Sequence, residues 1–256
     1  MESCVPCATP MEQNLKLRRD DSDLLPDSSQ YRSIVSSLIY LTHTRPDISY
    51  VVQVVSQFMS APQSSHLLAI MRILRYLSDT QDVGLFFPAT GTPDIEAYAY
   101  ADYASCMDTR RSTSGWCVKE GSSFISWRCK KQDRVSKSST EAEYRSMSEV
   151  TSELVWLRQL LEELGVVSIY PMRLYVDNTS AIKIATNLVL HDHTKHIEVH
   201  VHYIRQLVAE GHILLSYITS EDQTADLLTK AVATSRHWFL AHKLMLRKYH
   251  QFEGGC

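Results

Sequence analysis

Three acidic residues stand where secondary-structure elements are expected to begin or end: Glu143, Asp177 and Asp226. Glu143 lies four residues before Met147 and so extends the apolar stripe of an expected helix by one turn. A glutamate on that face is costly to bury unless it pairs or binds a metal ion. Asp177 follows an expected strand, and ligands collect at strand ends in α/β sheets. Asp226 falls in the first turn of another expected helix.

Clustered Asp and Glu side chains suit hard cations such as Mg²⁺, which takes oxygen ligands in octahedral geometry. Two such ions about 4 Å apart can hold an attacking water and a leaving oxygen in line for phosphodiester cleavage. That chemistry needs a carboxylate that bridges both ions, in addition to ligands for each one. The three acids therefore predict a nuclease-type site, provided that they converge.

Each acid also has a purely structural interpretation. Glu143 can be the capping-box glutamate of a helix that Thr140 caps, whereas Glu141 can close such a box with Ser138. Asp177 can help to cap the next helix. An acid at position 226 is favoured by the helix dipole alone. Spacing leaves both interpretations open.

The strand on which the acids are expected to converge is residues 95–104, where small and aromatic residues alternate with period two. Asp102 lies on the same face as Tyr100, two residues before it. Asp102 is thus a fourth, weaker candidate for a metal or catalytic role.

Periodicity and turn signals predict the elements that must position these residues. The expected helices span 31–42, 47–59, 65–77, 139–164, 178–185 and 194–209, with a last helix beginning at Ser220 and a helical basic tail from 234. The expected strands span 95–101, 114–119, 123–128, 172–176 and 213–219.

From residue 95 the order β-β-β-α-β-α-α-β-α predicts an α/β fold with a five-stranded mixed sheet and flanking helices, preceded by a small helical segment. Its first three strands are expected to be antiparallel, with two more added by crossovers. We expect four parts: a polar tail at 1–30, a helical segment at 31–90, the α/β domain at 91–232, and a basic C-terminal helix or tail at 233–256.

The formal net charge of −3 does not suggest a general affinity for nucleic acid, so any such surface must be local. Residues 128–137 supply five cations against the single acid Asp133. They can contact a phosphate backbone or form a solvated loop. The candidate nucleic-acid contacts are Arg128, Lys130, Lys131, Arg134 and Lys137.

Other candidate sites are weaker. Five histidines between positions 191 and 202 invite a zinc interpretation, but no acid or cysteine motif completes it. Cys4 and Cys7 form a lone CxxC with no second pair. No apolar run approaches the ~20 residues of a membrane span, and the N-terminus lacks a secretory pattern. We expect a cytoplasmic or nuclear protein that is not secreted, with no membrane partner and no small-molecule cofactor.

Six motifs occur in order along the chain: Thr44-Arg45-Pro46-Asp47-Ile48, Arg75-Tyr76-Leu77, Ser138-Ser139-Thr140-Glu141-Ala142-Glu143-Tyr144, Tyr175-Val176-Asp177-Asn178, Thr194-Lys195-His196-Ile197 and Ala225-Asp226-Leu227-Leu228-Thr229-Lys230. Together they resemble the C-terminal part of a Ty1/copia-type retrotransposon Pol polyprotein. The resemblance extends roughly from residue 9 to residue 238. It implies that 31–90 correspond to the end of a reverse transcriptase, without its polymerase aspartates, and that 91–232 form a ribonuclease H domain.

The resemblance also implies roles for individual residues. Glu143, Asp177 and Asp226 match the metal-binding carboxylates of ribonuclease H, an enzyme that cleaves the RNA strand of RNA–DNA hybrids. The implied cofactor is Mg²⁺ or Mn²⁺, with two ions in an active enzyme. The implied partners are an RNA–DNA hybrid and a reverse transcriptase or another protein chain.

The chain departs from the family pattern at its central strand. The family reads Tyr-Ser-Asp-Ala-Asp-Trp-Ala, so the aspartate that bridges the metals falls on Tyr100. A phenol, with a reference pKa of about 10, is neutral near pH 7 and cannot supply that negative charge. Asp102 lies about 7 Å further along the strand, since each residue advances ~3.4 Å. A second departure is Ser36, where the family usually has glycine.

Two hypotheses follow. One is a ribonuclease H that cleaves, or formerly cleaved, RNA–DNA hybrids by two-metal catalysis and is impaired by Tyr100. The alternative is a non-catalytic module that binds nucleic acid or a protein partner. A residual fragment of an element without a role is a third interpretation.

Overall fold

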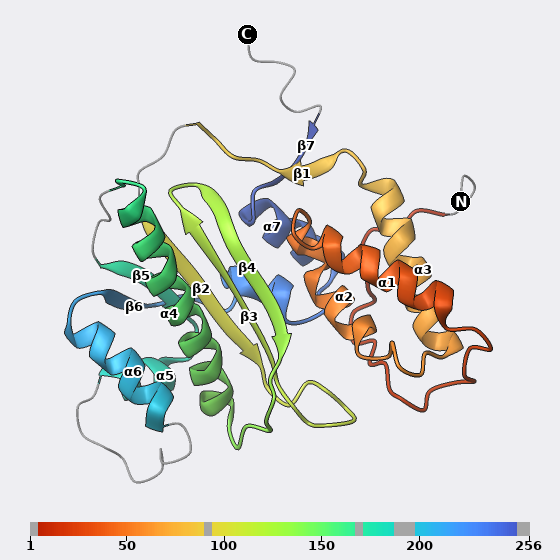
Figure 1. Ribbon diagram of the computed structural model, residues 1–256, viewed down its shortest axis with the longest axis horizontal. Helices are drawn as coiled ribbons and strands as arrows, with labels where there is room; N and C mark the ends of the chain where they lie inside the picture. The colour runs from red at the N-terminus through yellow and green to blue at the C-terminus, as the bar shows by residue number, and fades with distance from the viewer. Residues whose placement is uncertain (1–4, 90–93, 167–170, 187–197, 250–256) are drawn as a thin grey trace. The chain divides into compact units, whose positions relative to one another are not determined.

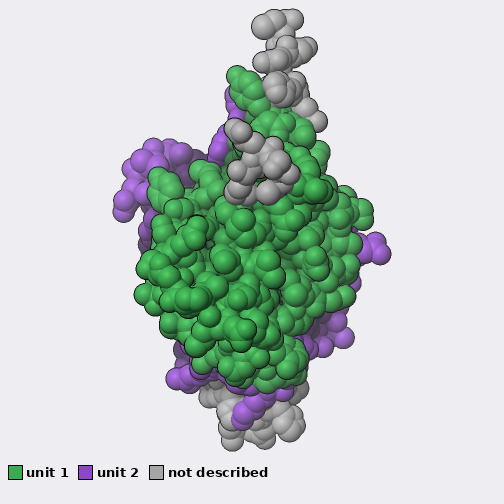
Figure 2. Space-filling view, turned by 90° about the vertical axis from the view of Figure 1, so that its right-hand side faces the viewer, with its two compact units in different colours: residues 1–86, 106–110, 230–256 green, residues 87–105, 111–229 purple. Residues whose placement is uncertain are grey.

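The computed structural model describes residues 5–89, 94–166, 171–186 and 198–249 (Figure 1). The chain divides into two compact units, which Figure 2 shows in different colours. Unit 1 comprises residues 1–86, 106–110 and 230–256, and unit 2 comprises residues 87–105 and 111–229. Compactness alone does not establish independent folding. The domain boundaries expected near residues 30, 90 and 232 therefore stay a prediction.

Unit 2 is built on a five-stranded sheet with the order β4-β3-β2-β5-β6. The β2–β3 and β3–β4 pairs are antiparallel, whereas the β2–β5 and β5–β6 pairs are parallel. This is the predicted α/β arrangement, a ribonuclease H-like mixed sheet. Its strands are β2 (Ile95–Asp102), β3 (Thr113–Glu120), β4 (Ser123–Lys131), β5 (Met172–Val176) and β6 (Ile213–Tyr217).

One face of the sheet is covered by the long helix α4 (Ser139–Glu163). Its Met147, Val150 and Leu154 are fully buried, as the apolar stripe predicts. The stripe does not continue to its predicted end, because Leu164 is 69% exposed at the end of the helix. Helices α5 (Thr179–Thr186) and α6 (Glu198–Ala209) contribute to the same core.

The segment after β6 differs from the prediction. Ser220 does not open an α-helix; Gln223 instead caps a short 3-10 helix, η3 (Thr224–Leu228). Its side-chain oxygen accepts a hydrogen bond from the Ala225 N–H at 3.2 Å. The capping-box spacing was a poor guide because the Thr219 hydroxyl and the Asp222 carboxylate bond to each other in a local turn.

Unit 1 is mainly helical. Its elements include α1 (Ser29–Leu41), the 3-10 helix η1 (Pro46–Ile48), α2 (Ser49–Ser56), α3 (Ser64–Asp79) and α7 (Thr234–Lys243). Tyr31, Ile48 and Ile73 are buried in its core. The helix expected at 47–59 is thus a 3-10 turn followed by a shorter α-helix, and it begins at Pro46 as proline geometry favours.

Residues near the N-terminus are attached to the start of α3. The Gln63 side-chain oxygen accepts hydrogen bonds from the Asp21 and Ser22 N–H groups at 2.9 and 3.1 Å. Leu24 also forms a β-bridge with Gln63. This stretch is therefore held as an extended lead-in, although its composition is that of a polar tail.

A two-stranded antiparallel sheet in unit 1 was not predicted. It pairs β1 (Val83–Leu85) with β7 (Leu246–Lys248). Strands of three residues are too short to show a period of two, so their pairing depends on distant chain segments meeting. Within the described ranges, no helix has the length and apolar character that crossing a membrane requires.

Candidate functional site

Glu143 reaches the central strand β2 from α4. Its carboxylate accepts a hydrogen bond from the Ala101 N–H at 3.3 Å, and the residue is only 3% exposed. The N-cap of α4 is Ser138, whose hydroxyl accepts from the Glu141 N–H at 3.1 Å. Glu143 is therefore not the capping-box glutamate, and the structural alternative for this residue is wrong.

The backbone of β2 around Tyr100 is contacted at three consecutive residues. Ser146, one turn after Glu143 on α4, donates its hydroxyl to the Tyr100 carbonyl at 3.0 Å. The buried side-chain amide of Gln223, the residue that caps η3, donates to the Ala99 carbonyl at 3.0 Å. The Ala99 carbonyl and the Ala101 N–H are accessible because the β2–β5 pairing extends only from Glu96 to Tyr98. The Tyr100 carbonyl points the other way, toward β3, where the Ser146 hydroxyl also lies 3.3 Å from the Gly115 carbonyl. Beyond Tyr98 the strands β2 and β5 are no longer paired, and side chains form the hydrogen bonds that β5 would otherwise supply.

Gly115 allows η3 to lie close to the sheet. It pairs with Tyr100 in the β2–β3 register, on the face opposite α4. A Cβ atom at Gly115 would lie 2.4 Å from the Thr229 Cγ2 and 2.9 Å from the Leu228 Cβ. Only glycine therefore permits this approach, which brings the segment carrying Asp226 against the face on which Tyr100 lies. Asp226 itself is 5% exposed.

The two remaining candidate acids lie at strand ends. Asp177 follows β5, and its carboxylate accepts a hydrogen bond from the Ser220 hydroxyl at 2.9 Å. Asn178, and not Asp177, caps α5 by accepting from the Ala181 N–H at 3.0 Å. Asp102 is the last residue of β2 and is half-buried, as is Tyr100.

Ser146, Gln223 and Gly115 were not predicted to belong to the site. For Gly115 a signal existed, since glycine inside a strand often marks the close approach of another backbone. Gln223 acts on a backbone carbonyl that is open because β2 and β5 separate, whereas Ser146 acts on carbonyls of the β2–β3 pair. No residue pattern reveals that separation.

The donor set does not fit two metal ions as it stands. Among residues in the described part of the chain, no group of three His, Cys, Asp or Glu side chains could hold a metal ion. The position on β2 that faces η3 carries the neutral phenol of Tyr100. Glu143, Asp177 and Asp226 all lie in the described ranges, so the structure does not bring these three acids together as a metal-holding group.

Known proteins resemble this chain along most of its length. The retrovirus-related Pol polyproteins from transposons RE2 and RE1 of Arabidopsis thaliana are 43% and 42% identical over 233 and 244 residues, or 91% and 95% of the chain. That from transposon TNT 1-94 of Nicotiana tabacum is 35% identical over 92% of the chain. The chain belongs to the copia-type retrotransposon Pol polyproteins. It spans only 16–18% of the length of these three relatives.

No protein-family model matches this Pol segment. Solved structures that resemble it include the N-terminal ribonuclease H domain of a Mycobacterium tuberculosis protein, with a TM-score of 0.39, 13% identity and coverage of 59% of this chain and 98% of that one. Another is LC11-RNase H1 in complex with an RNA/DNA hybrid, with a TM-score of 0.39, 12% identity and coverage of 53% and 94%. The fold assignment rests on the strand order and directions given above.

The predicted basic run of the Pol segment is divided between two faces. Arg128, Lys130 and Lys131 lie on β4, where alternation turns the first two toward the α4 face and the third away from it. Burial raises the pKa of Glu149 on α4, and Lys130 and Arg128 oppose that shift, so all three lie near one another. Arg134 and Lys137 are exposed in the loop before α4. Their role in nucleic-acid binding stays a prediction.

The histidine and cysteine candidates gain no support as metal sites. His191, His193, His196 and Cys4 lie outside the described residues. His200 contacts the Ser148 hydroxyl through Nδ1 at 2.9 Å, and burial lowers its pKa. Cys7 is a free thiol.

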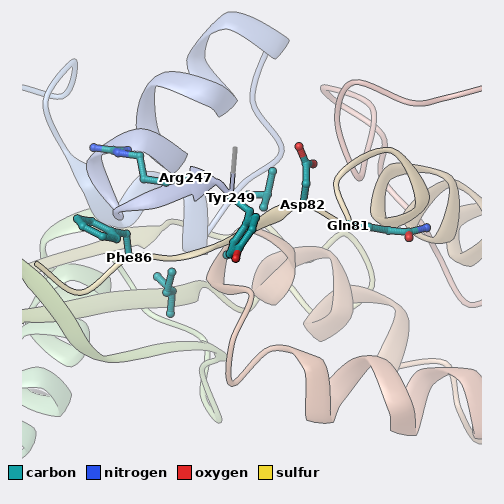
Figure 3. A pocket seen from close by; sticks show the side chains of 8 residues that line it. Gln81, Asp82, Phe86, Arg247 and Tyr249 are labelled. Carbon is teal, nitrogen blue, oxygen red and sulfur yellow. The ribbon is translucent and has the colours of Figure 1, made fainter. Parts of the chain in front are cut away.

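A cavity of about 700 Å³ lies in unit 1, along β1 (Figure 3). Its wall consists of Gln81, Asp82, Val83, Gly84, Leu85, Phe86, Arg247 and Tyr249. None of the candidate carboxylates is among these residues. The cavity is therefore separate from the site on β2.

Proposed function

We propose that unit 2 is a ribonuclease H-like domain that binds RNA–DNA hybrids and whose hydrolytic activity is strongly reduced by Tyr100. The observation that carries this proposal is the attachment of two acid-bearing segments to β2 on either side of Tyr100. Glu143 contacts the Ala101 N–H, and Gln223, three residues before Asp226, contacts the Ala99 carbonyl. This frame supports a site centred on position 100.

In this proposal Glu143, Asp177 and Asp226 are the metal-binding and catalytic carboxylates, with a minor contribution from Asp102. If a carboxylate at position 100 completed this set, Mg²⁺ or Mn²⁺ held there could activate a water and stabilise the leaving oxygen of the RNA strand. The phenol of Tyr100 supplies no charge to such ions and occupies the volume of one. Arg128, Lys130, Lys131, Arg134 and Lys137 are the proposed contacts to the hybrid backbone.

A cleavage assay on an RNA–DNA hybrid in Mg²⁺ and in Mn²⁺ tests the proposal. The chain as it stands should show little or no turnover, and Tyr100→Asp should raise the rate by orders of magnitude because it supplies the bridging carboxylate. Tyr100→Phe is the matched control and should stay inactive, since it keeps the ring without adding charge. Adding Glu143→Gln to Tyr100→Asp should abolish the gain. Robust turnover by the unaltered chain would refute the impaired site.

Tyr100 also favours a second function, that of a non-catalytic module binding nucleic acid or a protein partner. Hybrid affinity measured over a salt series separates the two kinds of partner. Phosphate contacts by the five proposed cations would make the affinity fall steeply with salt. A flat salt dependence together with a stable protein complex would favour the protein-binding module. If Tyr100→Asp binds hybrid but gains no activity, the catalytic set has changed elsewhere as well.

A further inference from the structure

The outer face of α7 in unit 1 carries an exposed aromatic ring flanked by two cations. Phe239 is 47% exposed. The guanidinium carbon of Arg236 lies 5.5 Å from the centroid of its ring, and the Lys243 Nζ lies 5.3 Å from it. The cations precede and follow Phe239 by three and four residues, so the three side chains share one helix face. We call them the α7 cluster.

The opposite face of α7 anchors the helix. His237, Leu240 and Ala241 are buried. The His237 ring packs edge-on against Tyr76 of α3, with 5.4 Å between ring centroids. The α7 cluster is therefore displayed on a helix that packs against the rest of unit 1.

The stretch of chain that carries the cluster contains basic but no acidic residues. Residues 230–249 contain five Lys and Arg residues and no Asp or Glu, although the whole chain has a net charge of −3. Lys248 pairs with Asp82 at 3.6 Å, and Arg247 donates to the His242 carbonyl at 2.8 Å. Arg236 and Lys243 are the cations positioned beside the exposed ring.

We propose that the α7 cluster binds single-stranded nucleic acid, with one base stacked on Phe239 and the flanking phosphates contacted by Arg236 and Lys243. Aromatic rings combined with a cationic surface are how proteins hold single strands without reading their sequence. A bound base would replace the cation–π contacts, which are weak at exposed sites, and the two cations would then contact the flanking phosphates. A duplex keeps its bases stacked and offers no face to the ring. This surface lies in unit 1 and is independent of hybrid cleavage by unit 2.

A basic helix face that is merely solvated is the main alternative, because most charge runs have no further role. The two interpretations differ in what the ring contributes. Non-specific attraction depends on the number of cations and is indifferent to Phe239. A stacking site loses affinity when the ring is removed while every charge is retained.

Fluorescence anisotropy with the full chain tests this, using short labelled strands of uridine, of thymidine and a DNA duplex of equal length. Phe239→Ala and Phe239→Leu should each weaken single-strand binding by about 10-fold, with little effect on the duplex. Arg236→Ala combined with Lys243→Ala should reduce the slope of log affinity against log salt by about 1.4, since each single-strand phosphate contact contributes about 0.7. Binding of either strand with these effects supports the proposal.

Matched controls come from the same unit. Tyr40→Ala removes an aromatic residue of α1 that is 80% exposed, and Lys16→Ala with Arg18→Ala removes two exposed cations. Neither control should weaken single-strand binding as the α7 cluster variants do. The proposal is overturned if no single strand binds, if Phe239→Leu retains full affinity, or if the control variants lose as much as the cluster variants.

Discussion

At the scale of single residues, the backbone of Tyr100 takes part in the fold, whereas its side chain bears on the proposed catalysis. Glu143, Ser146 and Gln223 each form a hydrogen bond with a backbone atom of β2. These hydrogen bonds do not depend on which side chain stands at position 100, so a tyrosine can replace an aspartate without removing any of them. Tyr100→Asp should therefore fold with the same sheet.

A side chain larger than that of glycine at position 115 would obstruct the close approach of η3 to the sheet. Gly115→Ala should lower the free energy of unfolding of unit 2 by about 1–3 kcal/mol, since its Cβ would lie 2.4 Å from the Thr229 Cγ2. Urea denaturation combined with hydrogen exchange of β3 and η3 peptides measures this. Gly84→Ala is the control, because a Cβ there meets nothing within 4 Å, and it should change stability by less than about 0.5 kcal/mol. Equal effects of the two substitutions would contradict the close approach.

At the scale of elements, one side chain, that of Gln223, both caps η3 and attaches it to the sheet. Gln223 is fully buried and uses both ends of its amide, donating to the Ala99 carbonyl and accepting from the Ala225 N–H. The same side chain therefore begins η3 and attaches it to β2. All five residues of η3 are buried, so packing and this hydrogen bond together hold the segment that carries Asp226.

Gln223→Ala should destabilise unit 2 by about 1–3 kcal/mol, because it leaves a buried carbonyl and a cap without their partner. In a Tyr100→Asp background it should also lower hybrid cleavage. Gln206→Ala is the matched control, since the Gln206 amide bonds to Glu210 on the exposed face of α6. Unchanged stability and cleavage in the Gln223 variant would show that η3 is positioned by other contacts.

At the scale of the molecule, unit 1 joins segments from both halves of the sequence through a buried polar network. Arg45 forms an ion pair with Asp47 at 2.7 Å, and the Tyr76 hydroxyl donates to Asp47 at 2.6 Å. His237 of α7 lies 2.9 Å from the Tyr76 oxygen through Nε2, and since that hydroxyl is already donating, we infer that the His237 Nε2–H donates. The C-terminal helix is thereby tied to residues almost 200 positions earlier.

This network should make the stability of unit 1 depend on pH. Burial lowers the pKa of His237 from 6.5 to about 4, an effect that Asp47 opposes and Arg45 reinforces. Between these values the unfolded chain binds a proton that the folded chain does not, so stability falls as pH drops from 6.5 to 4. The loss should total about 3 kcal/mol, since each pKa unit corresponds to about 1.4 kcal/mol.

Denaturation of His237→Gln at several pH values between 7 and 4 checks this expectation. Glutamine can still donate to Tyr76 but takes up no proton, so the acid-dependent part of the slope should shrink. His43→Gln, at an exposed position in the same unit, should leave the slope as it was. An identical slope in the His237 variant would mean that other groups carry the pH dependence.

Much of the fold was readable in advance because its signals are local. The stripe of α4, the turn at Gly121 with φ of 56° and the cap at Asn178 each depend on neighbouring residues. The elements that were misjudged depend on distant partners. β1 and β7 pair across more than 160 residues, and η3 takes its form from Gln223 and Gly115.

The sequence by itself determined the succession of strands and helices along the chain, the antiparallel pairing of the first three strands, the family and the tyrosine at position 100. These depend on short-range periodicity and on residue identity. Only the tertiary structure decided that β2 separates from β5 after Tyr98, and that Glu143 and Gln223 take up backbone groups left open there. The reason is that unpaired backbone groups inside a protein must find partners, and which side chains reach them is settled only when the sheet and its helices pack.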